Sequence, residues 1–374
     1  MDGDIAVIGL GSMGSMAAWR ISERTRARVI GFERFGVGHA RGAAAGESRL
    51  FRTAYHEGAG YVPLLLRSRR LWQELETLSG RQLLLPTGTL SLGDPTTEAL
   101  SEVRDSVRRH DLPHQLFDAD ELRQRYPQHA VADSDCGILD ELGGALRPEV
   151  AVASAVERAR TNGLEVHERE PVLGIETDGP AVIVRTGAGR YRVRHAVVTL
   201  GPWAQDLFPV LASALTLKTI VLTWFLPRDV RRYRPEVFPT FIRDTSDFHI
   251  FGAPSLDGYS VKVSGSPMWG TVPDADSVPR WLEDEALRSL GEHVQRLLPE
   301  LHPEPARHSV HTDAFTRDKT PAVGPVGENV TVLAGFSGHG FKLAPVFGEI
   351  AAQYAVDGGS DADVSMFAPE RLGF

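Results

Sequence analysis

The sequence predicts an α/β fold with some α+β character, organised as two domains, on three observations. A strand, a glycine-rich turn, a helix and a second strand follow one another within the first 33 residues. Helices and strands alternate again over 148–214 and near the C-terminus, and the stretch 215–262 between them is rich in strands. A chain of 374 residues is also long enough for two domains of ordinary size.

The N-terminal unit has the order expected of a dinucleotide-binding domain. An apolar strand over 4–8 leads into the turn Gly9-Leu10-Gly11-Ser12-Met13-Gly14, and a helix follows over 15–22. A second strand over 27–32 ends at Glu33, which lies 19 positions beyond the last glycine. This combination is the dinucleotide-binding fingerprint in its required strand and helix context.

Each residue of the fingerprint has a physical role. Gly9 permits the tight turn, and Gly11 allows backbone N–H groups to approach a pyrophosphate. Gly14 allows the helix to pack on the strand, and Glu33 is expected to accept the ribose hydroxyls. The fingerprint does not distinguish NAD from FAD, because both cofactors present the same pyrophosphate.

Apolar periodicity and turn residues predict the remaining elements. Helices are expected over 61–78, 96–110, 119–126, 148–162, 278–298 and 345–357, and strands over 83–92, 164–167, 195–200 and 330–334, with a β-meander ending at 194. We assign residues 1–85, 148–214 and 315–374 to a discontinuous nucleotide-binding domain. Residues 86–147 and 215–314 form the expected substrate domain.

Composition excludes several other classes of protein. A net charge of −9 without a dense Lys/Arg cluster argues against nucleic-acid binding. No stretch approaches the ~18 apolar residues of a membrane span, and the lone Cys136 and the acidic start predict a cytoplasmic protein. The histidines do not show metal-ligand spacing, and no Gly-x-Ser-x-Gly elbow indicates a hydrolase.

Three further segments carry recognisable motifs. They are Gly46-Glu47-Ser48-Arg49-Leu50-Phe51-Arg52 with the following Ala54-Tyr55, Glu57-Gly58 and Tyr61-Val62-Pro63, then Gly201-Pro202-Trp203, then Gly335-Phe336-Ser337-Gly338-His339-Gly340-Phe341-Lys342. With the N-terminal fingerprint, these segments resemble the monomeric sarcosine oxidase and N-methyl amino-acid oxidase family in order and spacing. The resemblance covers essentially the whole chain.

The resemblance implies a sarcosine-oxidase-like fold: a Rossmann-like FAD-binding domain with an inserted mixed-sheet substrate domain. It implies oxidation of the C–N bond of a small amino acid or N-alkyl amino acid to the imine, with hydride passing to flavin N5. O2 would then be reduced to H2O2. A monomer is expected, and a tailoring role in a biosynthetic pathway is a further hypothesis.

The resemblance also assigns the catalytic residues and the carboxylate-binding residues. Lys262 would face flavin N5 and stabilise developing superoxide, and Arg49 would lie close to the flavin. Arg52 and Lys342 would grip the substrate carboxylate. From the residues alone, Lys262 snorkelling from a sheet edge and arginines on a solvated helix edge stay open as alternatives.

The cofactor-binding residues that the resemblance implies are Gly9, Gly11, Ser12, Met13, Gly14, Glu33, Arg34, His39, Arg49, Val172, Gly201, Trp203, His311, Gly338, His339, Gly340, Phe341 and Lys342. The helix start at Gly338 and Gly340 would favour an anionic reduced flavin. His339 is read as an imidazole hydrogen-bonded within the glycine turn rather than as a general base.

The chain departs from the family at the flavin linkage. The family attaches FAD through a cysteine shortly before a Thr-x-Asp element, which here is Thr316-Arg317-Asp318. His311 stands at the cysteine position and Cys136 lies far away. We therefore expect non-covalent FAD, with a histidyl linkage at His311 as the alternative.

Four substitutions change the expected substrate pocket. Ala45 and Ser266 stand where the archetype has histidines, and Phe251 and Asp313 stand where it has tyrosines. Phe251, Ser266 and Asp313 are predicted to contact the substrate, and Asp313 would meet a cationic or hydroxylated side chain. Sarcosine itself is therefore not the expected substrate.

Three other functions remain possible on the sequence. One is a flavin-dependent amino-acid dehydrogenase that uses another electron acceptor, and another is an NAD(P)-dependent dehydrogenase. The third is a catalytically degenerate FAD-binding protein. The presence of Arg52, Lys262 and Lys342 favours the oxidase.

Overall fold

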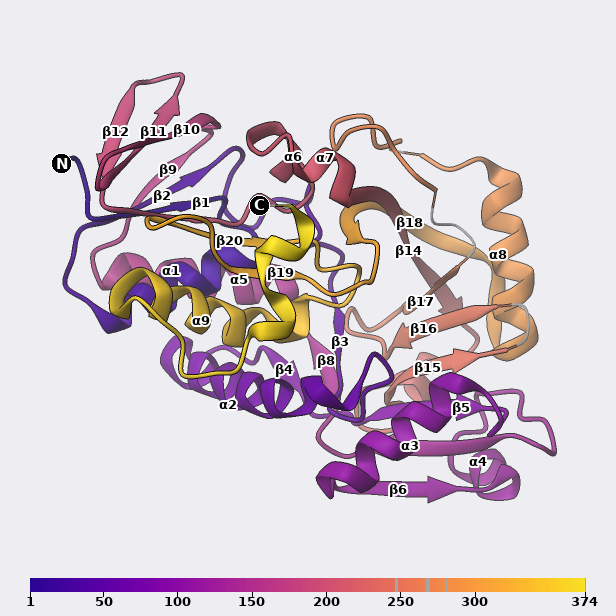
Figure 1. Cartoon of the computed structure of the whole chain (residues 1–374). Helices are drawn as coiled ribbons and strands as arrows, with labels where there is room; N and C mark the ends of the chain where they lie inside the picture. Colours follow the sequence, from indigo (N-terminus) through magenta and orange to yellow (C-terminus); the bar gives the residue numbers. More distant parts are fainter. Residues whose placement is uncertain (246–247, 267–269, 280, 374) are drawn as a thin grey trace.

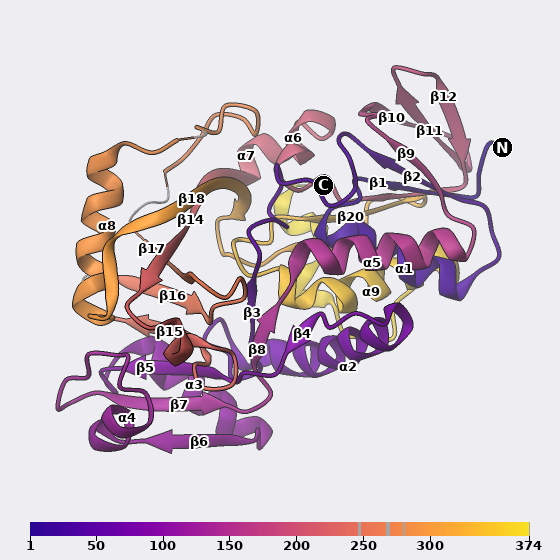
Figure 2. The same cartoon turned by 180° about the vertical axis from the view of Figure 1, so that it is seen from behind.

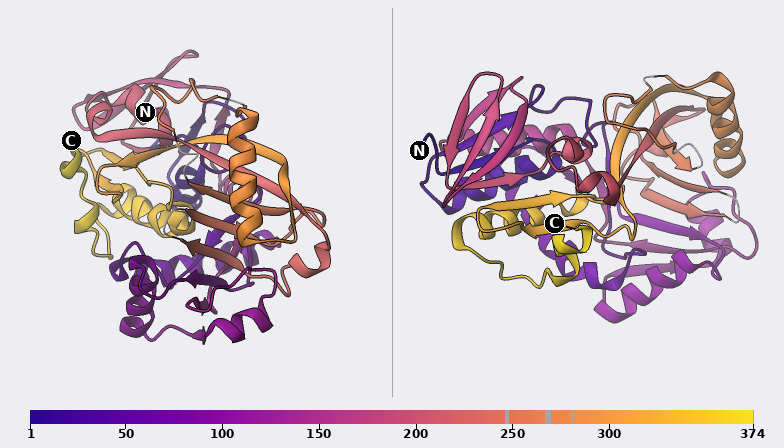
Figure 3. Two further views of the ribbon diagram at one scale, coloured as in Figure 1. Left: turned by 90° about the vertical axis from the view of Figure 1, so that its right-hand side faces the viewer. Right: turned by 45° about the horizontal axis from the view of Figure 1, so that its top comes forward.

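The computed structural model describes residues 1–245, 248–266, 270–279 and 281–373. Two sheets lie side by side and form the two halves of the molecule (Figures 1 and 3). None of the helices in the described ranges combines the length and the hydropathy that crossing a bilayer requires.

The first sheet has six strands, five of them parallel. Its order is β19 (Ala322–Pro325), β20 (Val330–Ala334), β13 (His195–Val198), β1 (Ile5–Ile8), β2 (Val29–Glu33) and β9 (Glu165–Glu168), with β19 antiparallel at one edge. Strand β1 lies in the middle because its four residues are all apolar and buried. A strand buried on both faces is typical of a parallel sheet covered on two sides.

The two faces of β1 pack against different layers. Ile5 and Val7 join the core formed with helices α1 (Ser12–Arg24), α2 (Val62–Ser79), α5 (Pro148–Thr161) and α9 (Ala344–Asp357). Ala6 and Ile8 face a small antiparallel sheet of β10 (Val172–Asp178), β11 (Ala181–Thr186) and β12 (Arg190–Val193). Figure 2 shows α1, α5 and α9 together on one side of the sheet and the small sheet on the other. This layered arrangement confirms the predicted Rossmann-like domain.

The second sheet has eight strands in mixed order. They are β18 (Leu301–Thr316), β14 (Leu215–Pro227), β17 (Val261–Ser266), β16 (His249–Ala253), β15 (Thr240–Asp244), β5 (Thr89–Gly93), β7 (Cys136–Asp140) and β6 (His114–Phe117). Only β15 and β5 pair in parallel. Helices α3 (Glu98–His110), α4 (Ala119–Arg125) and α8 (Asp284–Leu297) accompany this sheet (Figure 1).

The long strands β14 and β18 connect the two halves of the molecule. They pair antiparallel from Leu215 opposite Thr316 to Pro227 opposite Leu301. The sheets therefore draw on the segments expected for the two domains, although the exact domain boundaries stay a prediction.

Two predicted elements are wrong. The single strand expected over 83–92 is two strands, because Gly88 takes a φ of +73° and turns the chain between them. β4 (Leu84–Leu85) pairs with β8 (Gly144–Leu146), whereas β5 belongs to the large sheet. The helix expected over 278–298 begins only at Asp284, and residue 280 lies outside the described residues.

A buried carboxylate joins three helices of the first domain. Glu349 of α9 is 6% exposed and accepts hydrogen bonds from Arg20 of α1 at 2.9 Å and from Arg67 of α2 at 2.6 Å. Removing the carboxylate charge leaves Arg20 and Arg67 only their more exposed partners, Glu74 and Asp361, and takes away the one buried carboxylate that the two guanidinium groups share.

We expect Glu349→Gln to lower the free energy of unfolding by roughly 3 kcal/mol in urea titrations. Asp357→Asn is the matched control, since Asp357 on the same helix pairs with Arg24 at the exposed surface. The control should change stability by less than about 0.5 kcal/mol. A loss below about 1 kcal/mol for Glu349→Gln would show that the ion pairs do not hold the helices together.

Candidate active site

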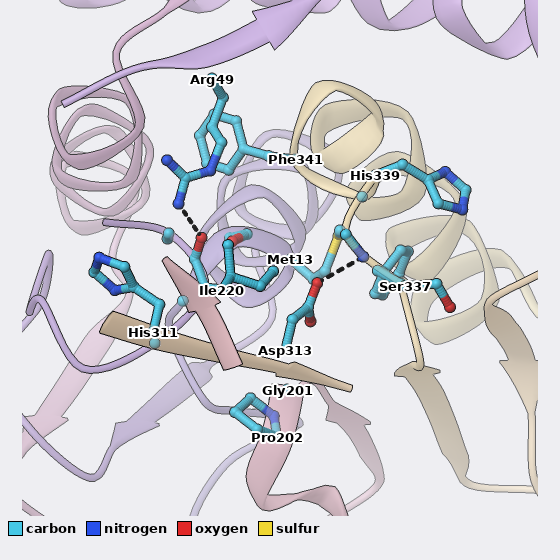
Figure 4. Close-up of a pocket in the computed structure, with 18 of the residues that line it drawn as sticks. Met13, Arg49, Gly201, Pro202, Ile220, His311, Asp313, Ser337, His339 and Phe341 are labelled. Atoms are coloured by element: carbon cyan, nitrogen blue, oxygen red, sulfur yellow. Dashed lines mark hydrogen bonds between the residues drawn. The ribbon is translucent and has the colours of Figure 1, made fainter. Parts of the chain in front are cut away.

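One large cavity of about 1100 Å³ runs from the N-terminal glycine turn to the interface of the two sheets. All predicted site residues whose side chains are described line this cavity, apart from Gly14. Ser266 ends β17 opposite His249, and its side chain lies outside the described part of the chain. Three segments that are far apart in sequence meet here (Figure 4): one supplies Met13, another Arg49, and β18 supplies both His311 and Asp313.

The glycine turn at the start of the cavity tests whether a dinucleotide fits. A Cβ atom added to Gly14 would lie 1.7 Å from the carbonyl oxygen of Gly9, so Gly14 is required by the packing of α1 on β1. A Cβ atom added to Gly11 would contact nothing within 4 Å. The open space beside Gly11, at the N-terminus of a 13-residue helix, suits a pyrophosphate.

Glu33 lies at the same end of the cavity. Its carboxylate accepts hydrogen bonds from the backbone N–H groups of Leu10 and Phe35, each at 2.9 Å, and lies 3.3 Å from His39. Burial opposes ionisation, but these hydrogen bonds outweigh it and lower the pKa of Glu33. The carboxylate is therefore ionised and able to accept hydrogen bonds from the hydroxyl groups of a ribose.

The glycine turn gives a prediction that separates folding from cofactor binding. We expect Gly11→Ala to keep the thermal stability of the apoprotein and to weaken FAD binding at least about tenfold, because the new methyl group points into the cofactor space. Gly14→Ala should lose both stability and FAD. Fluorescence titration of the apoproteins with FAD measures the affinity, and unchanged affinity in Gly11→Ala would contradict the assignment.

Lys262 of β17 lines the cavity. Its side chain is 2% exposed, and its ammonium donates to the carbonyl oxygens of Gly46 at 3.0 Å and Ser48 at 2.7 Å. Burial, followed by the charge of Arg49, lowers the pKa of Lys262 well below its usual value. The position of Lys262 excludes the alternative of a lysine snorkelling to solvent.

Arg49 is held in the same way by backbone carbonyls. Its guanidinium donates to Ser48 at 2.7 Å and Ala43 at 2.8 Å, and it also bonds to Ala45. Burial lowers the pKa of Arg49 to about 10, so the group remains a cation at neutral pH. These carbonyl contacts hold the charge at the cavity wall without neutralising it.

Arg52 forms an ion pair instead. Its guanidinium donates to Glu57 at 2.7 Å, bonds to His56, and lies over the ring of Tyr55. Although burial opposes ionisation of Glu57, the Arg52 charge leads the effects that lower its pKa to about 2. Arg52 is 5% exposed, which excludes the alternative of a solvated helix edge.

Lys342 completes the cationic group at the start of the segment leading into α9. Its ammonium donates to the His339 carbonyl at 2.9 Å and to the Tyr55 hydroxyl at 3.3 Å. Burial, followed by the charge of Arg52, lowers the pKa of Lys342 to about 7. Ser68 and Trp72 of α2 both donate to the Lys342 carbonyl and fix its backbone.

His339 takes part in a hydrogen-bonded chain through Tyr55. One ring nitrogen lies 2.9 Å from the Lys319 carbonyl and must donate to it, so the other, 2.9 Å from Tyr55, accepts the hydroxyl proton. Burial lowers the pKa of His339. Both nitrogens are therefore engaged, which agrees with the structural reading of this histidine.

Asp313 and His311 project from β18 toward the cavity (Figure 4). Asp313 accepts from the backbone N–H of Ala314 at 2.8 Å and of Gly338 at 2.9 Å, and burial raises its pKa to about 6. His311 lies 2.8 Å from the Ser309 hydroxyl, and burial lowers its pKa to about 3. In the described residues, no histidine, cysteine or carboxylate cluster is arranged to hold a metal ion.

Sequence reasoning assigned no role to four polar residues of the cavity region. Tyr55 and Glu57 belong to a motif segment, yet only the structure shows their contacts with Lys342 and Arg52. His56 lies between them. His249 lines the cavity and pairs with Asp244 at 2.6 Å. The alternation of β16 was a usable signal, since His249 and Phe251 are two residues apart and share a face.

Fold and site together define a flavoprotein oxidoreductase: a Rossmann-like domain, a mixed sheet over the cofactor space, and a cavity between them whose wall carries Arg49, Arg52, Lys262 and Lys342. The profile of the FAD-dependent oxidoreductase family matches residues 4–354. The chain belongs to this family.

Similar proteins narrow the class further. The chain is 35% identical to a monomeric sarcosine oxidase from Streptomyces avermitilis, over 99% of this chain and 97% of that protein. It is 30% identical to an N-methyl-L-tryptophan oxidase from Yersinia pestis over the full length of both proteins. The predicted family, the FAD cofactor and an oxidoreductase acting on amine C–N bonds are thereby confirmed.

Solved structures confirm the fold. NikD, an unusual amino acid oxidase essential for nikkomycin biosynthesis, has a TM-score of 0.85 and 23% identity, over 98% of this chain and 97% of that one. L-proline dehydrogenase from P. horikoshii also has a TM-score of 0.85, at 20% identity over 100% of this chain and 98% of the other. The sarcosine-oxidase-like prediction is therefore correct.

Proposed function

We propose that this protein is an oxidase of a small amino acid or N-alkyl amino acid. It converts the C–N bond to the imine and reduces O2 to H2O2. FAD held in the cavity would supply the hydride acceptor at N5 and the route of the electrons to O2. The observation that carries the proposal is the gathering of Arg49, Arg52, Lys262 and Lys342 around one cavity.

The cationic group supports recognition of a carboxylate. Of these four cations, only Arg52 has a carboxylate of the described residues within ion-pair distance. The other three are held by neutral oxygens. A substrate carboxylate between Arg52 and Lys342 would therefore gain charge-assisted hydrogen bonds. Because Glu57 already occupies one edge of the guanidinium, Lys342 carries more of this binding.

The same charges assist the loss of the ammonium proton that amine oxidation requires. Like-charge repulsion lowers the pKa of a bound amine, so a dedicated base is unnecessary. Asp313 is a predicted substrate contact whose carboxylate, ionised above its pKa of about 6, would attract a cationic group. We therefore expect Asp313 and Phe251, which both line the cavity, to influence which amine is accepted.

We propose that FAD is held without a covalent bond, because His311 stands where the resembled family has its linking cysteine. One ring nitrogen of His311 already lies 2.8 Å from the Ser309 hydroxyl. Acid precipitation of the yellow protein should release all of the flavin into the supernatant. Flavin that stays with the pellet in the native protein, but not in His311→Ala, would establish the histidyl linkage instead.

Oxygen reactivity tests the role of Lys262. We expect Lys262→Met to slow the reaction of reduced enzyme with O2 about 100-fold or more, since a buried cation stabilises the charge that develops on oxygen. Anaerobic flavin reduction by substrate should change less than about fivefold. Stopped-flow absorbance measures both steps. Equal slowing of both steps would show that Lys262 acts in structure or binding, and a native protein inert to O2 would favour the dehydrogenase.

The pH dependence of substrate capture tests Lys342. With a pKa near 7, its ammonium is present below that pH and lost above it, so kcat/KM for a carboxylate-bearing amine should fall above about pH 7. Lys342→Met should remove this limb and lower kcat/KM about 100-fold. An amine without a carboxylate is the control, and the same alkaline limb with that amine would contradict the assignment.

A further inference from the structure

The turn that holds Lys262 is formed by residues 46–48 and has an unusual backbone. Ser48 donates its N–H to the carbonyl of Gly46 at 2.7 Å, which closes a three-residue turn around Glu47. Glu47 has a φ of +68°, a conformation that costs free energy in a residue with a side chain. A γ-turn with positive φ is rare and strained, so neighbouring contacts must hold it in place.

A carboxylate provides these contacts on one side of the turn. Oε1 of Glu149 accepts the N–H of Gly46 at 2.6 Å and the N–H of Glu47 at 3.1 Å. Glu149 lies in the first turn of α5, where the helix dipole stabilises a negative charge. The N–H groups of Gly46 and Glu47 therefore point to Glu149, whereas the carbonyls of Gly46 and Ser48 accept from Lys262.

The side chain of Glu47 ties the turn to the large sheet. Its Oε2 accepts the indole N–H of Trp224 at 2.6 Å and lies 3.5 Å from Arg307. Lys262, Trp224 and Arg307 are direct neighbours on β17, β14 and β18, so their side chains share one face. Lys262 and Arg307 both lie over the Trp224 ring, at 5.7 Å and 4.1 Å from its centroid.

Two of the three ammonium protons of Lys262 are thus committed to the turn. The remaining N–H is the one that can face oxygen in the cavity, and its direction depends on where the two carbonyls lie. The charged or titratable groups around Lys262 are Arg49 on β3 (Arg49–Phe51), Glu47 in the turn, Glu149 on α5, and Arg307 and His311 on β18. Only Glu47 and Glu149 among them favour the ammonium form.

We propose that Glu149 and Glu47 are positioning residues for Lys262: they clamp the turn 46–48 from two sides, and the turn aims the ammonium into the cavity. Neither carboxylate accepts a hydrogen bond from Lys262 in the structure, so both act through the turn. The effect of the clamp on the reaction with O2 rests on the proposed oxidase function. The clamp itself can be tested without turnover.

The four lysines of the chain make that test direct. Holoenzyme labelled with 13C at lysine Cε gives few resonances, and Lys262→Met assigns the one from Lys262. In Glu149→Gln, which keeps an acceptor but removes the charge, we expect the apparent pKa of Lys262 to fall by about one unit. Glu47→Gln, on the other side of the turn, should also lower the apparent pKa of Lys262. Because two separate variants test the same quantity, the test stands even if one of them folds poorly.

Glu157→Gln is the matched control, since Glu157 lies on the same helix and pairs with Arg81 at the surface. It should leave the Lys262 titration unchanged. In stopped flow, Glu149→Gln should slow reoxidation by O2 about tenfold and move its alkaline limb to lower pH, with anaerobic reduction changed less than about threefold.

The outcomes separate the two proposals. An unchanged Lys262 titration in both Glu149→Gln and Glu47→Gln would overturn the clamp, as would a shifted titration with an unchanged oxygen reaction. If the native enzyme does not react with O2 at all, the oxidase proposal fails, while the Lys262 titration still decides whether the clamp exists.

Discussion

Four cationic side chains packed around one cavity form the constraint on which the rest of this structure depends. Arg52, Lys262 and Lys342 are buried, and Arg49 is partly buried. Charges withdrawn from water need compensating groups, and the chain supplies mainly backbone carbonyls rather than carboxylates. Carbonyl oxygens satisfy the hydrogen bonds of a cation but leave its charge in place. The part of the cavity wall that these four side chains form therefore keeps its positive charge, which is the basis of the proposed carboxylate binding.

This compensation explains several local features that otherwise look unrelated. The strained turn at Glu47 brings two carbonyls to Lys262, and the same region supplies three to Arg49. The contacts of α2 with the Lys342 carbonyl fix the segment that follows the glycine-rich turn. The turn meets Lys262 of the large sheet, so this part of the site exists only when the two halves of the chain are folded together. The α2 contacts lie within the core of the first domain. The groups of the site are preorganised before a ligand arrives.

Much of the fold was readable from the sequence because its signals are local. The glycine fingerprint, the buried strand β1 and the long amphipathic helices each follow from neighbouring residues. The strand 83–92 was misread because apolar content conceals the turn that Gly88 introduces, and the start of α8 has no strong capping signal. The site residues came from a family resemblance. The partners that hold them, Glu57 for Arg52 and Glu149 for the turn, are contacts that no local pattern encodes.

The most direct test of the account compares pairs of amines that differ only in a carboxylate, added anaerobically to purified yellow holoenzyme. We predict that a carboxylate-bearing amine bleaches the flavin absorbance at least about 100-fold faster than its decarboxylated counterpart at the same concentration. Admission of air should restore the colour and release one H2O2 per flavin. Equal bleaching by both members of the pair, or bleaching by neither across small N-methyl, cyclic and primary amino acids, would contradict the claim that the cationic cavity selects an amino-acid substrate.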